Sequence, residues 1–177
     1  MSTPGWRLFL ALELPAGTRA ELAAWTAAVV AGREGLRAVP EESLHVTLVF
    51  LGSTDPAGVP GIWAAVPAGG PAPGFSAGDL VALPRRRPRV FALGLEDGDG
   101  RAAALQREIA AGLGVSEGRP WLPHVTLARV RKGHRAAHLA TDAPAIDPFA
   151  PTAVSLLRSH PGSRYEVLER SERSQSS

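Results

Sequence analysis

The stretch HVTL, at residues 45–48, is repeated without change at residues 124–127, 79 positions later (124 − 45 = 79). Valine, threonine and leucine favour the pleated, half-buried surface of a β-strand. Because successive side chains of a strand alternate between its two faces, the histidine and the threonine of each copy share one face. Val46, Leu48 and Phe50 are expected on the opposite face, toward a core. Two such strands facing each other would form a site of two imidazoles and two hydroxyl groups.

The side chains that this repeat would bring together suit acid–base chemistry. An imidazole can give or take a proton near neutral pH, so two of them can act as one general acid and one general base. The hydroxyl groups of Thr47 and Thr126 lie on the same faces as the imidazoles and can donate hydrogen bonds to a bound group. Spacing alone leaves open which of His45 and His124 is the acid and which is the base.

Composition limits the class of protein. A length of 177 residues fits one domain, or two small lobes that share a core, and we expect residues 1–170 to form it, followed by a disordered tail over 171–177. The absence of cysteine excludes disulfides, thiolate nucleophiles and zinc–thiolate sites. A formal net charge of +2 argues against a protein that coats nucleic acid through bulk charge. No segment resembles a membrane span or a signal-peptide core, so a cytoplasmic protein that does not bind a membrane is expected. Nothing in the sequence demands more than a monomer or an obligate protein partner, and the oligomeric state stays open.

Periodicity along the rest of the chain predicts an α+β fold. Leucines alternate over residues 7–14, which predicts a strand with one buried face. Thr18 and Glu21 match a capping box, which predicts the start of a helix that Gly32 ends. Further strands are expected at 44–51, 75–83, 89–96, 124–130, 153–158 and 165–168, and further helices at 56–66, 102–113 and 133–140. Both halves share the order strand, helix, motif strand, helix. We therefore expect a bilobal architecture, in which two antiparallel-rich sheets with flanking helices surround a central cleft as a pseudo-twofold duplication.

In these surroundings the repeat resembles a known family. The chain is similar to the 2H phosphoesterase superfamily and, within it, to the bacterial and archaeal RNA 2′,3′-cyclic phosphodiesterases, once called 2′-5′ RNA ligases. The resemblance covers nearly the whole chain, and the stretches that carry it are 7–12, 44–52, 86–90, 119–129 and 163–168. It implies hydrolysis of the 2′,3′-cyclic phosphate ends of RNA, such as tRNA fragments, to 2′-phosphomonoesters, without a metal or another cofactor.

The same resemblance implies roles for individual residues. His45 would be the proton donor to the leaving 3′ oxygen, and His124 the proton acceptor that activates water. Thr47 and Thr126 would hydrogen-bond the phosphate oxygens. The family also places an arginine just after the second motif, which here is Arg129. Because five residues separate it from His124, an unbroken strand would turn it away from the site, and it reaches the phosphate only if the strand ends or bulges there.

Three further side chains are candidate substrate contacts. Phe9 faces away from the leucine row, so it would either stack on a nucleobase or pack against the sheet. Arg87 belongs to a dense basic cluster at 85–89, which would either contact RNA phosphates or form a solvated loop. Arg119 precedes the second motif, where it would either contact the substrate or lie in solvent.

Several alternatives stay open. The residues His134 and His138 have the spacing of metal ligands on a helix, but the glutamate of a zinc protease helix is missing between them, so no metal is expected there. A metal held by His45 and His124 would lack carboxylate ligands at a suitable spacing. The alternative functions are 2′-5′ RNA ligation, hydrolysis of a small cyclic nucleotide, and RNA binding with residual activity.

Overall fold

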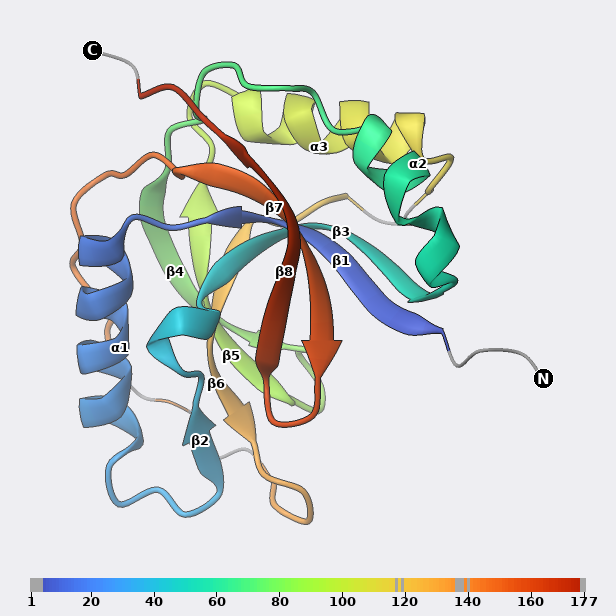
Figure 1. Cartoon of the computed structure of the whole chain (residues 1–177). Helices are drawn as coiled ribbons and strands as arrows, with labels where there is room; N and C mark the ends of the chain where they lie inside the picture. The colour runs from blue at the N-terminus through green and yellow to red at the C-terminus, as the bar shows by residue number, and fades with distance from the viewer. Residues whose placement is uncertain (1–4, 117, 119, 136–138, 140, 176–177) are drawn as a thin grey trace.

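The computed structural model describes residues 5–116, 118, 120–135, 139 and 141–175. In this part of the chain, strands and helices alternate in an α+β arrangement (Figure 1). The elements are β1 (Trp6–Glu13), α1 (Ala16–Val30), β2 (Leu36–Ala38), η1 (Glu41–Ser43), β3 (His45–Thr54), η2 (Pro56–Gly58), α2 (Val59–Ala64), β4 (Ser76–Leu83), β5 (Val90–Glu96), α3 (Arg101–Gly112), β6 (His124–Val130), β7 (Ala153–His160) and β8 (Arg164–Glu172).

The strands form two antiparallel groups that meet at the repeated motif. The order across the sheet is β4-β5-β6-β3-β1-β7-β8, and β2 also pairs with β6. The junction between β3 and β6 is narrow, because the pairing there consists of Val46 opposite Val125. These two valines are equivalent positions of the HVTL repeat, so the junction lies on the pseudo-twofold axis. The predicted bilobal α+β class is confirmed, with a first lobe of β1, β3, β7 and β8 and a second lobe of β2, β4, β5 and β6.

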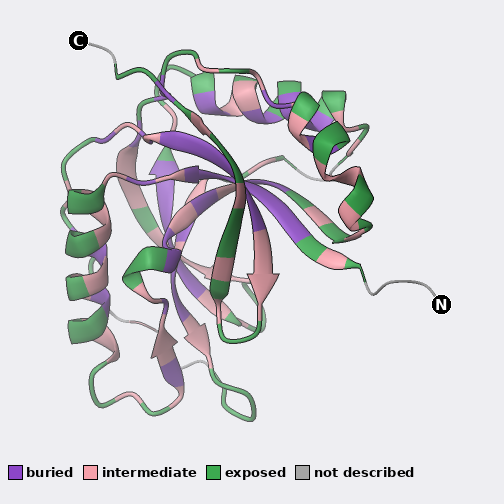
Figure 2. Cartoon of the chain, viewed as in Figure 1, coloured by how far each residue is buried: buried purple, intermediate pink, exposed green. Residues whose placement is uncertain are grey.

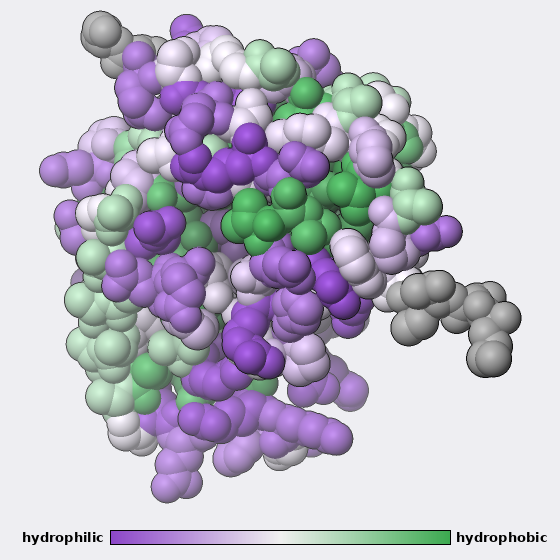
Figure 3. All heavy atoms as spheres, viewed as in Figure 1, coloured by the Kyte–Doolittle hydropathy of each residue, from purple (hydrophilic) through white to green (hydrophobic). Residues whose placement is uncertain are grey.

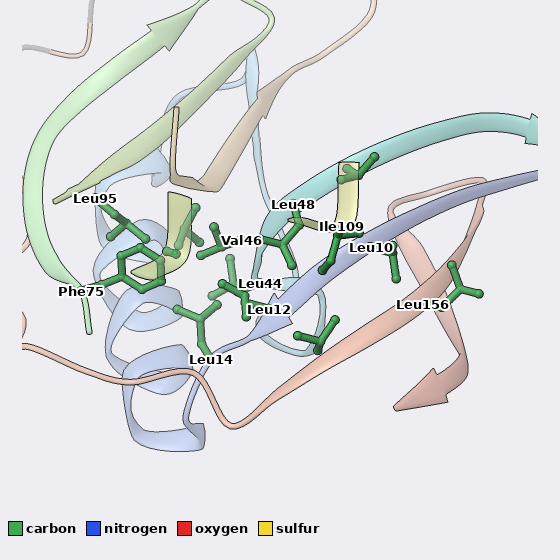
Figure 4. Packing of buried hydrophobic residues seen from close by; sticks show 14 of the residues in the cluster. Leu10, Leu12, Leu14, Leu44, Val46, Leu48, Phe75, Leu95, Ile109 and Leu156 are labelled. Carbon is green, nitrogen blue, oxygen red and sulfur yellow. The ribbon is translucent and has the colours of Figure 1, made fainter. Parts of the chain in front are cut away.

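The apolar faces of both lobes contribute to one core. The alternating leucines of β1 are buried on the same side as Val46 and Leu48 of β3, and Leu22 of α1 and Ile109 of α3 pack into the same cluster (Figure 4). Each long helix crosses the junction: α1 follows a strand of the first lobe and contacts β2 and β6, whereas α3 follows a strand of the second lobe and contacts β3. The buried residues therefore concentrate on the strands and on the inner faces of the helices (Figure 2). Because the helices take one side of the sheet, the opposite side around the junction is left for a site.

The start of the first helix differs from the prediction. Helix α1 begins at Ala16, two residues before Thr18, with Pro15 at the N-cap and no side-chain cap hydrogen bond. Proline presets a φ compatible with a helix start and has no N–H to satisfy, so the helix begins directly after it and the Thr18–Glu21 capping box is wrong. The predicted end is confirmed, because Gly32 takes a φ of 72°, a left-handed conformation that glycine adopts without strain.

The end of the chain also differs from expectation. Strand β8 continues through Ser171 and Glu172, and the side chain of Arg173 is 7% exposed. The Arg173 guanidinium donates to the carbonyl groups of Pro67 and Gly69, and Ala72 N donates to Ser174 O. Residues 173–174 are therefore hydrogen-bonded to residues 67–72, which connect the two halves of the chain. The expected tail is therefore ordered through Gln175, and residues 176–177 lie outside the described part.

Two smaller points concern helices. Residues 133–135 and 139 are not helical, and the rest of the helix expected at 133–140 lies outside the described residues. Among the helices that the structure describes, none combines the length and apolar character needed to cross a membrane.

Candidate active site

The two repeated histidines are held in the same way, on either side of the junction. The Nδ1 atom of His45 lies 2.8 Å from the carbonyl oxygen of Ser43, and that of His124 lies 2.8 Å from the carbonyl oxygen of Leu122. A carbonyl oxygen only accepts hydrogen bonds, so Nδ1 donates in both cases. Each imidazole is thereby anchored to the backbone two residues before it, and each keeps Nε2 for another partner. The sequence repeat is thus also a repeat of side-chain geometry.

His45 has the more enclosed environment of the two. Its ring lies 5.0 Å from that of Phe9 and 5.2 Å from that of Tyr165, which meets it edge-on at 86°. Burial lowers the pKa of His45 from its ordinary value of 6.5 to about 4, and the charges of Arg129 and His124 lower it further, although the hydrogen bond to Ser43 opposes the shift. His45 is therefore neutral at pH 7 in the free protein.

This protonation state fixes the hydrogen bond between His45 and Thr47. The Nε2 atom of His45 lies 3.1 Å from Thr47 Oγ1. Because the proton of the neutral ring is on Nδ1, the hydroxyl group of Thr47 donates and Nε2 accepts. The histidine and the threonine of the first motif are therefore side by side on one face, as strand alternation predicts.

Both motif strands carry a β-bulge at the same place in the repeat. In β3, Thr47 pairs with Ala11 and Val49 with Leu10, which leaves Leu48 without a partner. In β6, Thr126 pairs with Ala92 and Ala128 with Phe91, which leaves Leu127 without a partner. A bulge adds one residue to a strand, so it reverses the alternation of faces beyond it. The residues five positions after each histidine therefore return to the side of the imidazoles.

The second bulge turns Arg129 toward the site. Its charge is close enough to lower the pKa of His45, which lies on the other motif strand. Its Nε is buried and finds no hydrogen-bond partner among the described residues. A buried guanidinium N–H without a partner is costly, and an oxyanion bound between the lobes would satisfy it. The sequence predicts that Arg129 can reach a phosphate only if β6 ends or bulges after the motif, and β6 does have such a bulge.

The first bulge has the same effect on Phe50, and here the sequence prediction is wrong. Phe50 is 64% exposed instead of facing the core with Val46 and Leu48. Its ring centroid is 6.0 Å from that of Phe9, on the side of the sheet that carries His45. The bulge at Leu48 reverses the expected face, and the resulting exposed aromatic ring is a site residue that sequence reasoning missed.

The other aromatic candidate is buried. Phe9 is 4% exposed and packs against Ala11, Leu157 and Tyr165 as well as His45. Its ring has no free face for a nucleobase, so the packing alternative fits the structure. Tyr165, from the last strand, completes the wall around His45, and no local sequence pattern marks it as part of the site.

A cavity of about 1170 Å³ opens beside His124 and Thr47. Phe50 also lines it, and Trp121 lines it from the segment before β6. The indole Nε1 of Trp121 donates a 2.9 Å hydrogen bond to the carbonyl oxygen of Thr47 and so ties the two motif strands together. The two motifs are therefore linked by a side chain as well as by the sheet.

The opposite side of the site is bridged by the β7–β8 hairpin. Ser43 Oγ donates to the carbonyl oxygen of Ser163 at 2.7 Å, and Arg37 donates to Ser163 Oγ at 3.1 Å. Ser163 lies at the hairpin tip with a φ of 60°, a conformation that is uncommon for a residue other than glycine. The lower half of the face in Figures 1 and 3, where β2 and this hairpin lie, is mainly hydrophilic. These contacts join the β7–β8 hairpin of the first lobe to β2 and to the segment before β3.

The remaining candidates are placed as follows. Arg87 is exposed on the β4–β5 loop and does not line the cavity, whereas its neighbours Arg85 and Arg89 do. Arg119 and His138 lie outside the described residues, and His134 is exposed. Within the described ranges, no three His, Asp or Glu side chains gather closely enough to hold a metal ion.

Two antiparallel groups of strands meet at the paired His-x-Thr motifs, as the resemblance to two-histidine phosphoesterases implies. The family model described as "LigT like Phosphoesterase" matches residues 12–92. This segment contains the first motif, and the structural comparisons extend over the second. A comparison with curated proteins found no match.

The solved structures that are similar cover nearly the whole chain. The crystal structure of TT0787 of Thermus thermophilus has a TM-score of 0.80 and 27% sequence identity, over 94% of this chain and 97% of that one. The structure of E. coli LigT complexed with phosphate has a TM-score of 0.74 and 26% identity, over 98% and 100% of the two chains. The complex of E. coli LigT with 3′-AMP gives 0.76 and 27%, over the same shares. The chain is therefore similar to LigT-like phosphoesterases over nearly its whole length, in agreement with the resemblance seen in the sequence.

Proposed function

We propose that the protein hydrolyses the 2′,3′-cyclic phosphate ends of RNA to 2′-phosphomonoesters. The observation that carries this proposal is the pair of equivalent imidazoles, each anchored through Nδ1, on either side of the Val46–Val125 junction. The charge of Arg129, whose buried Nε has no partner among the described residues, acts on His45. An anion bound there would meet one acid, one base and a cation. In-line opening of a phosphodiester requires these groups.

The proposed reaction assigns one proton transfer to each histidine. His124 takes a proton from a water molecule as the water oxygen attacks the phosphorus atom. The bond between phosphorus and the 3′ oxygen breaks, and His45 gives a proton to that oxygen. The product carries a 3′ hydroxyl group and a 2′ phosphate. Thr47 and Thr126 donate hydrogen bonds to the non-bridging oxygens, where negative charge is held during the attack.

His45 must gain a proton before it can act as the donor. In the free protein its pKa is about 4, and its Nε2 accepts the hydroxyl proton of Thr47. A bound phosphate anion favours the charged imidazole and competes for the Thr47 hydroxyl, so substrate binding raises the pKa of His45. The low pKa in the free protein favours the reverse assignment, in which His45 is the base and His124 the acid. The two assignments differ in how each variant responds to an easier leaving group.

The substrate is proposed to be a nucleotide end because of the groups around the cavity. The exposed ring of Phe50, next to Thr47, offers a face on which a nucleobase can stack. E. coli LigT has been crystallised with phosphate and with 3′-AMP, which supports a nucleotide phosphate as the bound group here. A small cyclic nucleotide and a 2′-5′ linkage present the same phosphate, so hydrolysis of small cyclic nucleotides and RNA ligation are the alternatives to test.

The test is an assay on a short RNA that ends in a 2′,3′-cyclic phosphate, with EDTA present. Wild type, His45→Ala and His124→Ala are compared, and the position of the product phosphate is identified. We expect a 2′-phosphate from the wild type and a loss of roughly 10²–10⁴-fold in each variant, the usual effect of removing a general acid or base. No turnover by wild type, or unchanged activity in both variants, would overturn the proposal. A parallel reaction with a 5′-hydroxyl RNA shows whether ligation competes.

A further inference from the structure

The cavity beside Thr47 and His124 is also lined by residues that the proposed reaction does not use. It reaches from Thr47 and His124 to the hairpin between β4 and β5, where Arg85 and Arg89 line it. Its volume of about 1170 Å³ exceeds the range of roughly 300–1,000 Å³ that is typical of small-molecule pockets. The site thus has room for more than one nucleotide.

The two arginines that line the cavity are exposed cations on a structured turn. Arg87 N donates to Pro84 O, and Arg89 N donates to Leu83 O at 2.8 Å, so the turn is closed by its own backbone. No described carboxylate forms an ion pair with Arg85 or Arg89. Asp79 and Asp142 share a neighbouring cavity with Arg85 but lie beyond ion-pair distance from it.

Part of the cavity wall is apolar. Leu122 is 49% exposed, and Trp121 lies beside it. An exposed leucine and an indole ring offer a surface on which a base can lie, while unpaired arginines attract a phosphate. The cavity that Thr47 and His124 line therefore also offers apolar surface for a base and two cations for a phosphate.

We propose that Arg85 and Arg89 bind the phosphate that joins the last two nucleotides of the RNA, and that Trp121 and Leu122 contact the penultimate base. This inference rests on the proposed function, in which the cyclic phosphate lies between His45 and His124. Only one ribose then separates the reacting phosphate from the next phosphate of the strand. The protein should therefore prefer the end of an oligonucleotide to a cyclic mononucleotide as its substrate.

The test compares three substrates: adenosine 2′,3′-cyclic phosphate, the dinucleotide ApA with a 2′,3′-cyclic phosphate end, and the same dinucleotide with an uncharged methylphosphonate linkage. We expect kcat/KM for the natural dinucleotide to exceed that for the mononucleotide on the order of tenfold. The methylphosphonate should lose most of this advantage, since it keeps both bases and removes only the charge. Raising the salt concentration should also reduce the advantage, as expected for a phosphate contact.

The variants Arg85→Ala and Arg89→Ala should bring the ratio of the two kcat/KM values toward one. Arg86→Ala is the matched control, because Arg86 is exposed on the same turn but does not line the cavity, and it should keep the ratio of the wild type. Equal kcat/KM for mononucleotide and dinucleotide in the wild type would overturn the second phosphate site and leave the proposed function standing. Failure to hydrolyse either substrate would instead overturn the proposed function.

Discussion

Replacing His45 with glutamine is expected to remove a step in the pH dependence of stability. Burial lowers the pKa of His45 from its ordinary value of 6.5 to about 4 in the folded protein. Between these pH values the unfolded chain binds a proton at this position that the folded protein does not bind. The free energy of unfolding of the wild type therefore falls as the pH drops from about 6.5 to about 4, and this contribution is constant above and below that window.

The size of the step follows from the shift. At about 1.36 kcal/mol per pKa unit, the difference between 6.5 and about 4 corresponds to at most about 3 kcal/mol. His45 is half-buried, so water screens part of this. Urea unfolding at intervals between about pH 4 and about pH 7.5 measures the free energy of unfolding for wild type, His45→Gln and the control His134→Gln, in which an exposed histidine is changed.

The comparison rests on slopes rather than on single values, because the substitution itself changes stability by an amount that does not depend on pH. Carboxylates titrate in the same window, but they do so equally in all three proteins. Between about pH 4 and about pH 6.5, the free energy of unfolding of His45→Gln should rise less steeply with pH than that of the wild type. The slope of His134→Gln in this range should equal that of the wild type. Equal slopes in wild type and His45→Gln would refute the reasoning that burial keeps His45 neutral.

Three further predictions concern the surroundings of the imidazoles. Arg129→Ala should lower kcat/KM on the cyclic-phosphate RNA roughly 10²–10³-fold, with partial recovery in Arg129→Lys, and an unchanged rate would contradict the position assigned to this arginine. Tyr165→Leu should raise the pKa of His45 measured by NMR titration, because it exposes the imidazole to water, whereas Tyr165→Phe should leave that pKa unchanged. Equal pKa values of His45 in the two variants would count against the shielding of His45 by the ring of Tyr165. Phe50→Ala should raise KM about tenfold, since stacking of a base on an aromatic ring contributes roughly 1–3 kcal/mol. The control Val167→Ala, at an exposed apolar position outside the cavity, should leave KM unchanged. An unchanged KM in Phe50→Ala would exclude stacking on this ring.

The strands and their faces follow largely from local sequence. The alternation of residues 7–14 places one row of leucines in the core, and the HVTL repeat places both histidines on the opposite face, because alternation is a property of a single strand. The helix start at Ala16 lies two residues before the predicted one, because the capping box competes with Pro15, whose φ already suits a helix. The ordered end of the chain is not predictable in this way, since its contacts are made with residues 67–72, far away in the sequence.

The candidate site follows only in part from the sequence. The two His-x-Thr pairs are local, and the sequence predicts them directly. The orientation of Arg129 and Phe50 depends on bulges at Leu127 and Leu48, and a bulge is set by the register with a partner strand, which a single strand does not encode. Tyr165 reaches His45 from the last strand of the sheet, so no pattern near the motif indicates it.

The central claim is that the two equivalent imidazoles divide the reaction into one proton donation and one proton abstraction. The most direct measurement uses a cyclic-phosphate substrate in which sulfur replaces the leaving 3′ oxygen, because a thiolate leaves without being protonated. Wild type, His45→Ala and His124→Ala are compared on the oxygen and sulfur substrates. The account predicts that sulfur restores most of the activity of His45→Ala and none of that of His124→Ala. Rescue of His124→Ala alone would reverse the assignment, and rescue of neither variant would contradict the claim that one histidine acts by protonating the leaving group.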